Sequence, residues 1–429
     1  MNRTACALFL LAFGLSATAP RAPGADATDV KELLANLRKA DPTDRRKAAE
    51  AISDICKTGD GDFVAAVPAL VEALKDRDAI VRGELAEALG FIGPDAKSAI
   101  PAVRALLRDP IPEVRAKAAF ALGGFGDEAK ATVPDLIALL KDRDEQVRAS
   151  AAAGLGEIGP AAKAAVPGLI GLLKDTDPEV RLNAAATLGV FGGDAKSADR
   201  AMLPLLKDRD EGVRGQAAET LGKLGADPKL VVPALTSALA DKHPGVRGDV
   251  AHALATFKDK AKSAVPALTK MLKDTDHGVR VHAAEAVYEI DGNTKLVLPV
   301  LIEGLKHEDP FVRGDAAHTL GEIGPPAKDA LPAIRAALRD ENPGIRVHAA
   351  EALVKVDRAA VKDALPVLVE GLKSTDKTLR SEAAEALGGI GPEARDAVPA
   401  LTPLTKDRNK DVRRSASEAI RRIEGKTNR

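Results

Sequence analysis

Histidine and carboxylate side chains alternate at equivalent places in one part of this chain. All 7 histidines lie between His243 and His348. In four cases a carboxylate stands three residues away, so that both side chains of a pair share one face of a helix. The pairs are Asp249 with His252, His282 with Glu285, Asp315 with His318, and His348 with Glu351. Imidazole and carboxylate groups on adjacent helices are ligands for zinc, iron or manganese.

A copied block of sequence explains the same pattern without any chemistry. The segment 246–254 (VRGDVAHAL) returns as 312–320 (VRGDAAHTL), and 279–287 (VRVHAAEAV) returns as 345–353 (IRVHAAEAL). Duplication copies side chains whether or not they function. We expect no catalytic residue, no metal and no other cofactor. The alternative is a metal-dependent or lyase-like enzyme that holds a divalent metal such as Zn or Fe on His252, His282, His318 and His348.

The histidines keep fixed distances from an arginine that recurs almost every 33 residues. The recurring arginines, here called the ladder arginines, are Arg82, Arg115, Arg148, Arg181, Arg214, Arg247, Arg280, Arg313, Arg346, Arg380 and Arg413. A fixed period of this length is typical of stacked repeats. The histidine–carboxylate pairs occupy the positions two and five residues after a ladder arginine, which we call the polar row.

One repeat, residues 134–166, predicts two helices joined by a tight turn. Pro134 suits a first helical turn, and Asp144 suits the N-cap of a second helix over 145–158. Gly156 and Gly159 are expected to end that helix. The recurring alanine pair, Ala151 and Ala152 in this repeat, allows the helices of adjacent repeats to approach closely. No segment predicts a strand.

The pattern Asp-x-Asp-x-x-Val-Arg-x-x-Ala-Ala-x-x-Leu-Gly-x-Ile-Gly at 142–159 resembles HEAT repeats. More narrowly, it is similar to the short HEAT-like subtype first associated with phycobilisome lyases. The resemblance implies an all-α, right-handed α-solenoid of about twelve two-helix repeats. It also implies that each ladder arginine and the aspartate six residues before it form a structural ladder of ion pairs between repeats. His307 and Ser374 replace that aspartate in two repeats.

The polar row is predicted to line the concave side of the solenoid and to bind a protein or peptide. Carboxylates occupy it in other repeats as well, which predicts an acidic groove; these residues are Glu84, Glu87, Glu382 and Glu385. Lys and Arg total 62 against 63 Asp and Glu, and aromatic residues are only 2%. Neither a basic field nor stacking platforms are therefore present for nucleic acid, which we exclude as a partner. We expect a monomer.

The first 27 residues predict a secretory signal peptide. A basic Arg3 precedes a short apolar run at 5–15, and small residues at 25 and 27 suit cleavage after Ala27. We therefore expect a secreted or periplasmic protein without a transmembrane segment after cleavage. The remaining 28–429 is expected to form one solenoid, with a capping repeat at 28–67, regular repeats at 68–398 and a capping repeat at 399–429. Cys56 is predicted to be buried in the first repeat.

Overall fold

The computed structural model describes residues 27–58 and 63–425. Within these ranges the chain is helical and contains no strand, which confirms the predicted all-α class. It packs as two compact units, Met1–Ala234 and Leu235–Arg429, a division that the even sequence period does not predict. The predicted signal peptide lies outside the described residues except for Ala27, where the first described helix begins.

In the first unit, each repeat contributes a first and a second helix. The first helices are α2 (Ala27–Asn36), α4 (Val67–Ala73), α6 (Ile100–Ala105), α8 (Val133–Leu139), α10 (Val166–Leu172) and α12 (Asp199–Met202). The second helices are α3 (Pro42–Thr58), α5 (Ala79–Ile92), α7 (Pro112–Gly124), α9 (Glu145–Ile158), α11 (Pro178–Phe191) and α13 (Glu211–Lys223). Helix α14 (Pro228–Ala238) spans the division between the units.

The second unit repeats this arrangement. Its first helices are α16 (Val265–Met271), α18 (Thr294–Gly304), α20 (Leu331–Ala337), α22 (Val361–Gly371) and α24 (Val398–Leu401). Its second helices are α15 (Pro244–Ala255), α17 (His277–Asp291), α19 (Pro310–Ile323), α21 (Pro343–Val356), α23 (Lys377–Ile390) and α25 (Lys410–Ile423). The described residues therefore contain the predicted succession of helix pairs.

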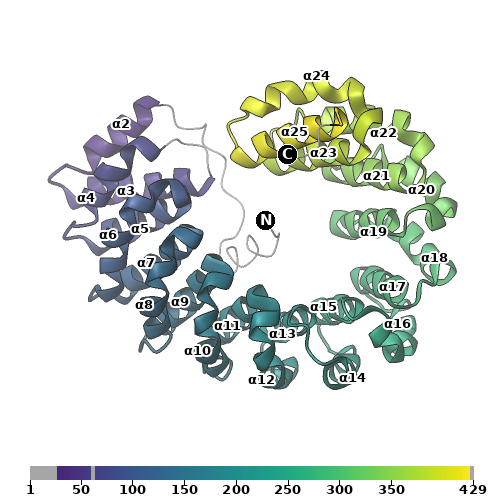
Figure 1. Cartoon of the computed structure of the whole chain (residues 1–429), viewed down its shortest axis with the longest axis horizontal. Helices are drawn as coiled ribbons and strands as arrows, with labels where there is room; N and C mark the ends of the chain where they lie inside the picture. Colours follow the sequence, from purple (N-terminus) through teal and green to yellow (C-terminus); the bar gives the residue numbers. More distant parts are fainter. Residues whose placement is uncertain (1–26, 59–62, 426–429) are drawn as a thin grey trace. The chain divides into compact units, whose positions relative to one another are not determined.

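Within each unit the second helices form one layer and the first helices another (Figure 1). Successive second helices, such as α7 and α9, are in extensive direct contact, whereas successive first helices touch much less. The tighter layer lies on the inner side of the curve that each unit makes by itself (Figure 1). The polar row belongs to this inner layer because it lies on the second helices.

Small residues produce the close packing of the second helices. Ala151 and Ala152 are completely buried, as the sequence predicted. Glycines bring the backbones even closer, since a Cβ on Gly154 would lie 2.4 Å from the carbonyl oxygen of Ala119. The buried leucines, including Leu136, Leu155 and Leu169, fill the space between the two layers. The core is therefore a continuous strip within each unit, as stacked repeats require.

The local signals at the ends of the second helices act as predicted, with two corrections. The Asp144 side chain accepts hydrogen bonds from the N–H groups of Gln146 and Val147 at the start of α9. Gly159 ends α9 with a φ of 77°, a conformation that favours glycine. The loop predicted after this helix is instead a 3-10 helix over Gly159–Ala165. Gly156 lies inside α9, where it packs against Thr187.

Candidate binding surface on the second helices

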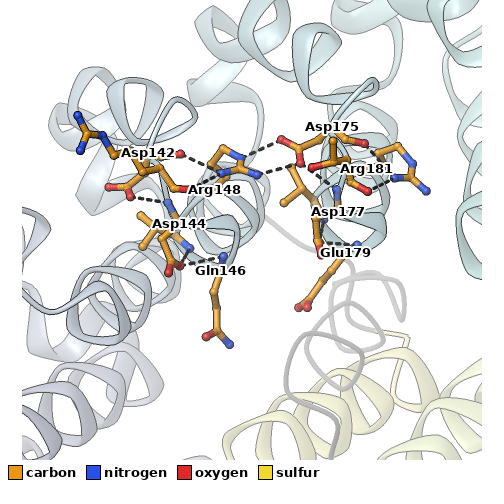
Figure 2. Close-up of polar contacts among 12 residues, drawn as sticks. Asp142, Asp144, Gln146, Arg148, Asp175, Asp177, Glu179 and Arg181 are labelled. Atoms are coloured by element: carbon orange, nitrogen blue, oxygen red, sulfur yellow. Dashed lines mark hydrogen bonds and ion pairs between the residues drawn. The ribbon is translucent and has the colours of Figure 1, made fainter.

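The ladder arginines join one repeat to the next through paired hydrogen bonds (Figure 2). Arg148 donates to both carboxylate oxygens of Asp175, which lies 27 residues later, at 2.8 and 2.9 Å. The same side chain donates to the backbone carbonyl of Asp142, in its own repeat, at 2.9 Å. Each ladder arginine with these contacts, here called a rung, therefore links the aspartate of the following repeat to the turn of the arginine's own repeat. Equivalent ion pairs are Arg45–Asp76, Arg82–Asp109, Arg115–Asp142, Arg181–Asp208, Arg247–Asp274, Arg313–Asp340 and Arg380–Asp407.

The ladder aspartate Asp175 is held in the ionised form. Burial alone would raise the pKa of Asp175, but hydrogen bonds from Arg148 and from the Asp177 N–H outweigh burial. The pKa of Asp175 is consequently lower than its ordinary value. Its bond with the Asp177 N–H, 3.0 Å long, also fixes the turn before the second helix. Each ladder aspartate therefore has two separate tasks, which are to shape the turn and to bind the preceding arginine.

Two replacements in the second unit keep only the first of these tasks. His307 Nδ1 accepts the Asp309 N–H at 3.0 Å, and Ser374 Oγ accepts the Asp376 N–H at 3.0 Å. Neither side chain offers a carboxylate to the preceding ladder arginine. Arg280 turns instead to Glu303 on α18, at 3.3 Å. The sequence identified both departures, but it did not show what becomes of the arginines.

In the first unit, the structure corrects the acidic groove predicted at the polar row. Glu84 and Glu87 on α5 both form ion pairs with Lys117 on α7, the latter at 3.1 Å. Burial is the main reason that the pKa of Glu87 is raised. Burial would lower the pKa of Lys117, but the two carboxylates raise it above the ordinary value. The prediction from sequence did not include Lys117 in the polar row, although it stands two residues after Arg115 and hence belongs to that row.

Further along the first unit, the polar row is small and uncharged. Its residues on α9 and α11 are all buried, namely Ser150, Ala153, Asn183 and Ala186. At the α5–α7 end of this stretch, Phe91 and Phe120 meet edge to face, with ring centroids 6.5 Å apart. The first unit therefore presents few free charges on α7, α9 and α11, because small side chains let the helices close over the row.

In the second unit, the histidines reach carboxylates on the next repeat. His252 on α15 lies 3.5 Å from Glu285 on α17, and His282 on α17 lies 3.4 Å from Asp315 on α19. Gly248 leaves the space that the His282 ring occupies. His252 and Asp315 are each more than half exposed, so this part of the row faces solvent. The sequence placed these groups on one surface but did not predict pairing across repeats.

The side chains in the second copy of the histidine block make different contacts from those in the first. Lys355 on α21 forms ion pairs with Glu322 at 2.7 Å and with Glu351 at 3.0 Å. Because Lys355 holds Glu351, the structure gives no His318–Glu351 pair to match His252–Glu285. Within the part of the chain that the structure describes, the side chains of His318 and His348 have no ion pair. The 66-residue sequence repeat is therefore not a repeat of contacts.

The remaining row residues lie on α23 at the far end of the second unit. Glu385 is exposed and accepts a hydrogen bond from Ser415 on α25 at 2.9 Å. Glu382, in the same helix, is half-buried. Residues 27–58 and 63–425 contain no group of three or more His, Cys, Asp or Glu side chains that could hold a metal ion. The four histidines named above are thus arranged in pairs with carboxylates or singly.

The His282–Asp315 pair predicts a pH-dependent contribution to stability. Burial would lower the pKa of His282, but the hydrogen bond and charge of Asp315 raise it above 6.5. A raised pKa stabilises the fold below the ordinary value, and this contribution disappears as the pH rises through the folded-state pKa. We expect Asp315→Asn to destabilise the second unit by up to about 1 kcal/mol at pH 5.5 and by less at pH 8. Urea unfolding at both pH values measures this, and an equal loss at both would contradict it.

Comparison with protein-family models matches HEAT repeats over residues 30–110, 100–173, 133–202, 166–255, 232–302, 298–377 and 365–428. The chain therefore belongs to the HEAT-repeat family. The matches do not distinguish the phycobilisome-lyase subtype. A search of curated proteins gave no match.

Among solved structures, the chain is similar to an engineered protein at 25% identity with a TM-score of 0.39, covering 92% of this chain and 99% of the other. It is also similar to Kap95 in a Kap95:Nup1 complex, at 15% identity and a TM-score of 0.49, over 99% of this chain and 64% of that one. It is similar to Kap121p bound to Nup53p as well, at 16% identity and a TM-score of 0.43, over 93% of this chain and 49% of Kap121p.

Two further predictions concern residues away from the row. Cys56 is buried in α3, as expected, and burial raises the pKa of its thiol to about 12. The thiol is therefore unreactive at neutral pH. Among the described residues, no helix has the length and apolar character needed to cross a membrane.

Proposed function

We propose that this HEAT-repeat protein is a non-catalytic scaffold that binds a protein or peptide partner along the inner layer of second helices. The HEAT-repeat solenoid is typically a non-enzymatic scaffold, and its extended curved surface suits an extended partner. In the second unit the polar row keeps charged groups accessible to solvent, whereas α7, α9 and α11 of the first unit do not. We therefore assign partner binding to the polar row of α15, α17 and α19.

The observation that carries this assignment is the run of His252, Glu285, His282 and Asp315, in which His252 and Asp315 are exposed and the other two are half-buried. These groups alternate in kind across three repeats and remain partly open to solvent. Such a run can form hydrogen bonds and weak ion pairs with a polar or basic segment. Because the charges are exposed, we expect the affinity to fall as the salt concentration rises. An affinity that does not change with salt would argue against this surface.

We also propose that the protein acts outside the cytoplasm, in a secreted or periplasmic location, as a monomer. The support for the location is the sequence of residues 1–27. Expression of the full chain in its native cell, followed by determination of the N-terminal residue of the mature protein, tests this. Cleavage after Ala27 is the expected result, and a mature protein that retains residues 1–27 would exclude it.

A photo-crosslinking experiment tests the binding surface. A crosslinking amino acid is placed at His252 or at His318, both exposed on the inner layer, and at Lys270, which is exposed on the first helix α16. We expect a partner to be captured from the native cell fraction at His252 and His318 and not at Lys270. Equal capture at Lys270 would mean that the inner layer is not the binding surface.

A further inference from the structure

Where α21 packs against α23, the ladder arginine Arg346 has no carboxylate partner. Arg346 donates to the backbone carbonyls of Asp340 and Glu341 at 2.9 and 3.2 Å, as Arg313 and Arg380 do to the carbonyls of their own turns. Its Nε and its second terminal nitrogen have no partner within residues 27–58 and 63–425. Neither nitrogen is sealed from solvent. One edge of this guanidinium is thus fixed and the other is open.

The open edge of Arg346 lies where a carboxylate binds the ladder arginine in most other repeats. In the preceding repeat, where α19 packs against α21, Asp340 lies 2.7 Å from Arg313. At Arg380, one joint later, both oxygens of Asp407 accept hydrogen bonds at 2.9 Å. At Arg346 the corresponding residue is Ser374, whose hydroxyl shapes the turn through Asp376 and provides no charge. The ladder arginines in the repeats before and after Arg346 therefore both have a carboxylate partner, and they show the geometry that a carboxylate at Arg346 would adopt.

Arg280, the other ladder arginine of the second unit whose partner aspartate is replaced, finds a carboxylate elsewhere, whereas Arg346 does not. Glu303 on α18 reaches Arg280 at 3.3 Å. Its equivalent on α22 is Glu370, ten residues before its own ladder arginine, and Glu370 pairs with Lys373 at 3.1 Å. No carboxylate of α22 pairs with Arg346, so this ladder arginine has no substitute for the missing aspartate.

We propose that the open edge of Arg346 is a receptor for a carboxylate carried by an acidic segment of a partner protein. A guanidinium binds a planar carboxylate through two parallel hydrogen bonds, and this geometry already forms at the neighbouring rungs. The arginine is held in place by its two carbonyl contacts, so little side-chain freedom is lost when the ligand binds. The site lies at the turns between first and second helices, and it is separate from the polar row.

Binding of a labelled peptide to the full chain tests the proposal. The probe alternates glutamate and glycine, has an amidated C-terminus, and is followed by fluorescence anisotropy; the control peptide has glutamine in place of glutamate. We expect the glutamate peptide to bind the wild-type protein and the glutamine peptide to bind at least about tenfold more weakly.

Two substitutions of equal charge locate the site. Ser374→Asp supplies the missing carboxylate from within the chain, so we expect it to weaken peptide binding about tenfold or more. Thr375→Asp, at an exposed neighbouring position, adds the same charge outside the rung and should weaken binding far less. Ser374→Asp should also raise the thermal midpoint of the second unit.

The proposal is overturned by either of two results. These are absence of binding to the wild-type protein, or equal effects of Ser374→Asp and Thr375→Asp. Arg346→Gln provides a second check that does not depend on the new carboxylate, because it should weaken binding as much as Ser374→Asp does. Retention of wild-type affinity by Arg346→Gln would also refute the assignment.

Discussion

Replacement of Arg181 by alanine is expected to destabilise the first unit by about 3–5 kcal/mol. Arg181 is almost fully buried and donates two hydrogen bonds to Asp208, at 2.7 and 2.8 Å. It also donates to the backbone carbonyls of Asp175 and Thr176. The substitution leaves a carboxylate and two carbonyls of the α11–α13 joint without their donor. Hydrogen exchange of the amides in α11 and α13, together with urea unfolding, measures the loss.

Arg346→Ala is the matched control for this prediction. Arg346 makes the same contacts with backbone carbonyls as Arg181 but pairs with no acid, so its removal strands no carboxylate. We expect a loss of about 1–2 kcal/mol. If the two substitutions destabilised their units equally, the stability would come from the turn contacts and not from the ion pairs between repeats.

The second large effect is expected from Gly154→Ala in α9. The new Cβ would lie 2.4 Å from the backbone carbonyl oxygen of Ala119 in α7, which is impossible unless the two helices move apart. Overpacking of this kind costs about 1–3 kcal/mol, and a contact with backbone leaves no flexible side chain to adjust. We expect a loss near 3 kcal/mol, seen as a lower urea midpoint and faster exchange in α7 and α9.

Gly171→Ala, in the first helix α10, makes the same chemical change where space is free. No atom lies within 4 Å of the added Cβ, so the higher helix propensity of alanine should stabilise by up to about 1 kcal/mol. A destabilisation by Gly171→Ala as large as that by Gly154→Ala would show that close packing of the second helices is not the reason.

Much of the fold follows from patterns contained in one repeat. The period of the ladder arginines, the N-cap at Asp144 and the end of α9 at Gly159 all act within 33 residues, where local propensity and capping decide the structure. The family pattern predicted the ladder as well, and the structure places Arg148 between its own turn and Asp175. The division into two compact units was not visible in so regular a sequence.

The candidate site was only partly predictable. The sequence located the polar row, because equal spacing from a ladder arginine puts residues on one face of every second helix. It could not determine which charges in that row remain free. Glu84 and Glu87 both pair with Lys117, 33 residues after Glu84, whereas His252 and Asp315 keep much of their surface exposed.

The sequence by itself determined the repeat, the helices and the positions where repeats differ, since these depend on residue types at fixed local spacing. Only the tertiary structure decided the pairing of charges between repeats. Glu303 reaches Arg280, whereas the equivalent Glu370 turns to Lys373 and leaves Arg346 open. The physical reason is that these pairs depend on which side chains the packing of adjacent helices brings within reach, and the spacing of residues within one repeat does not specify that.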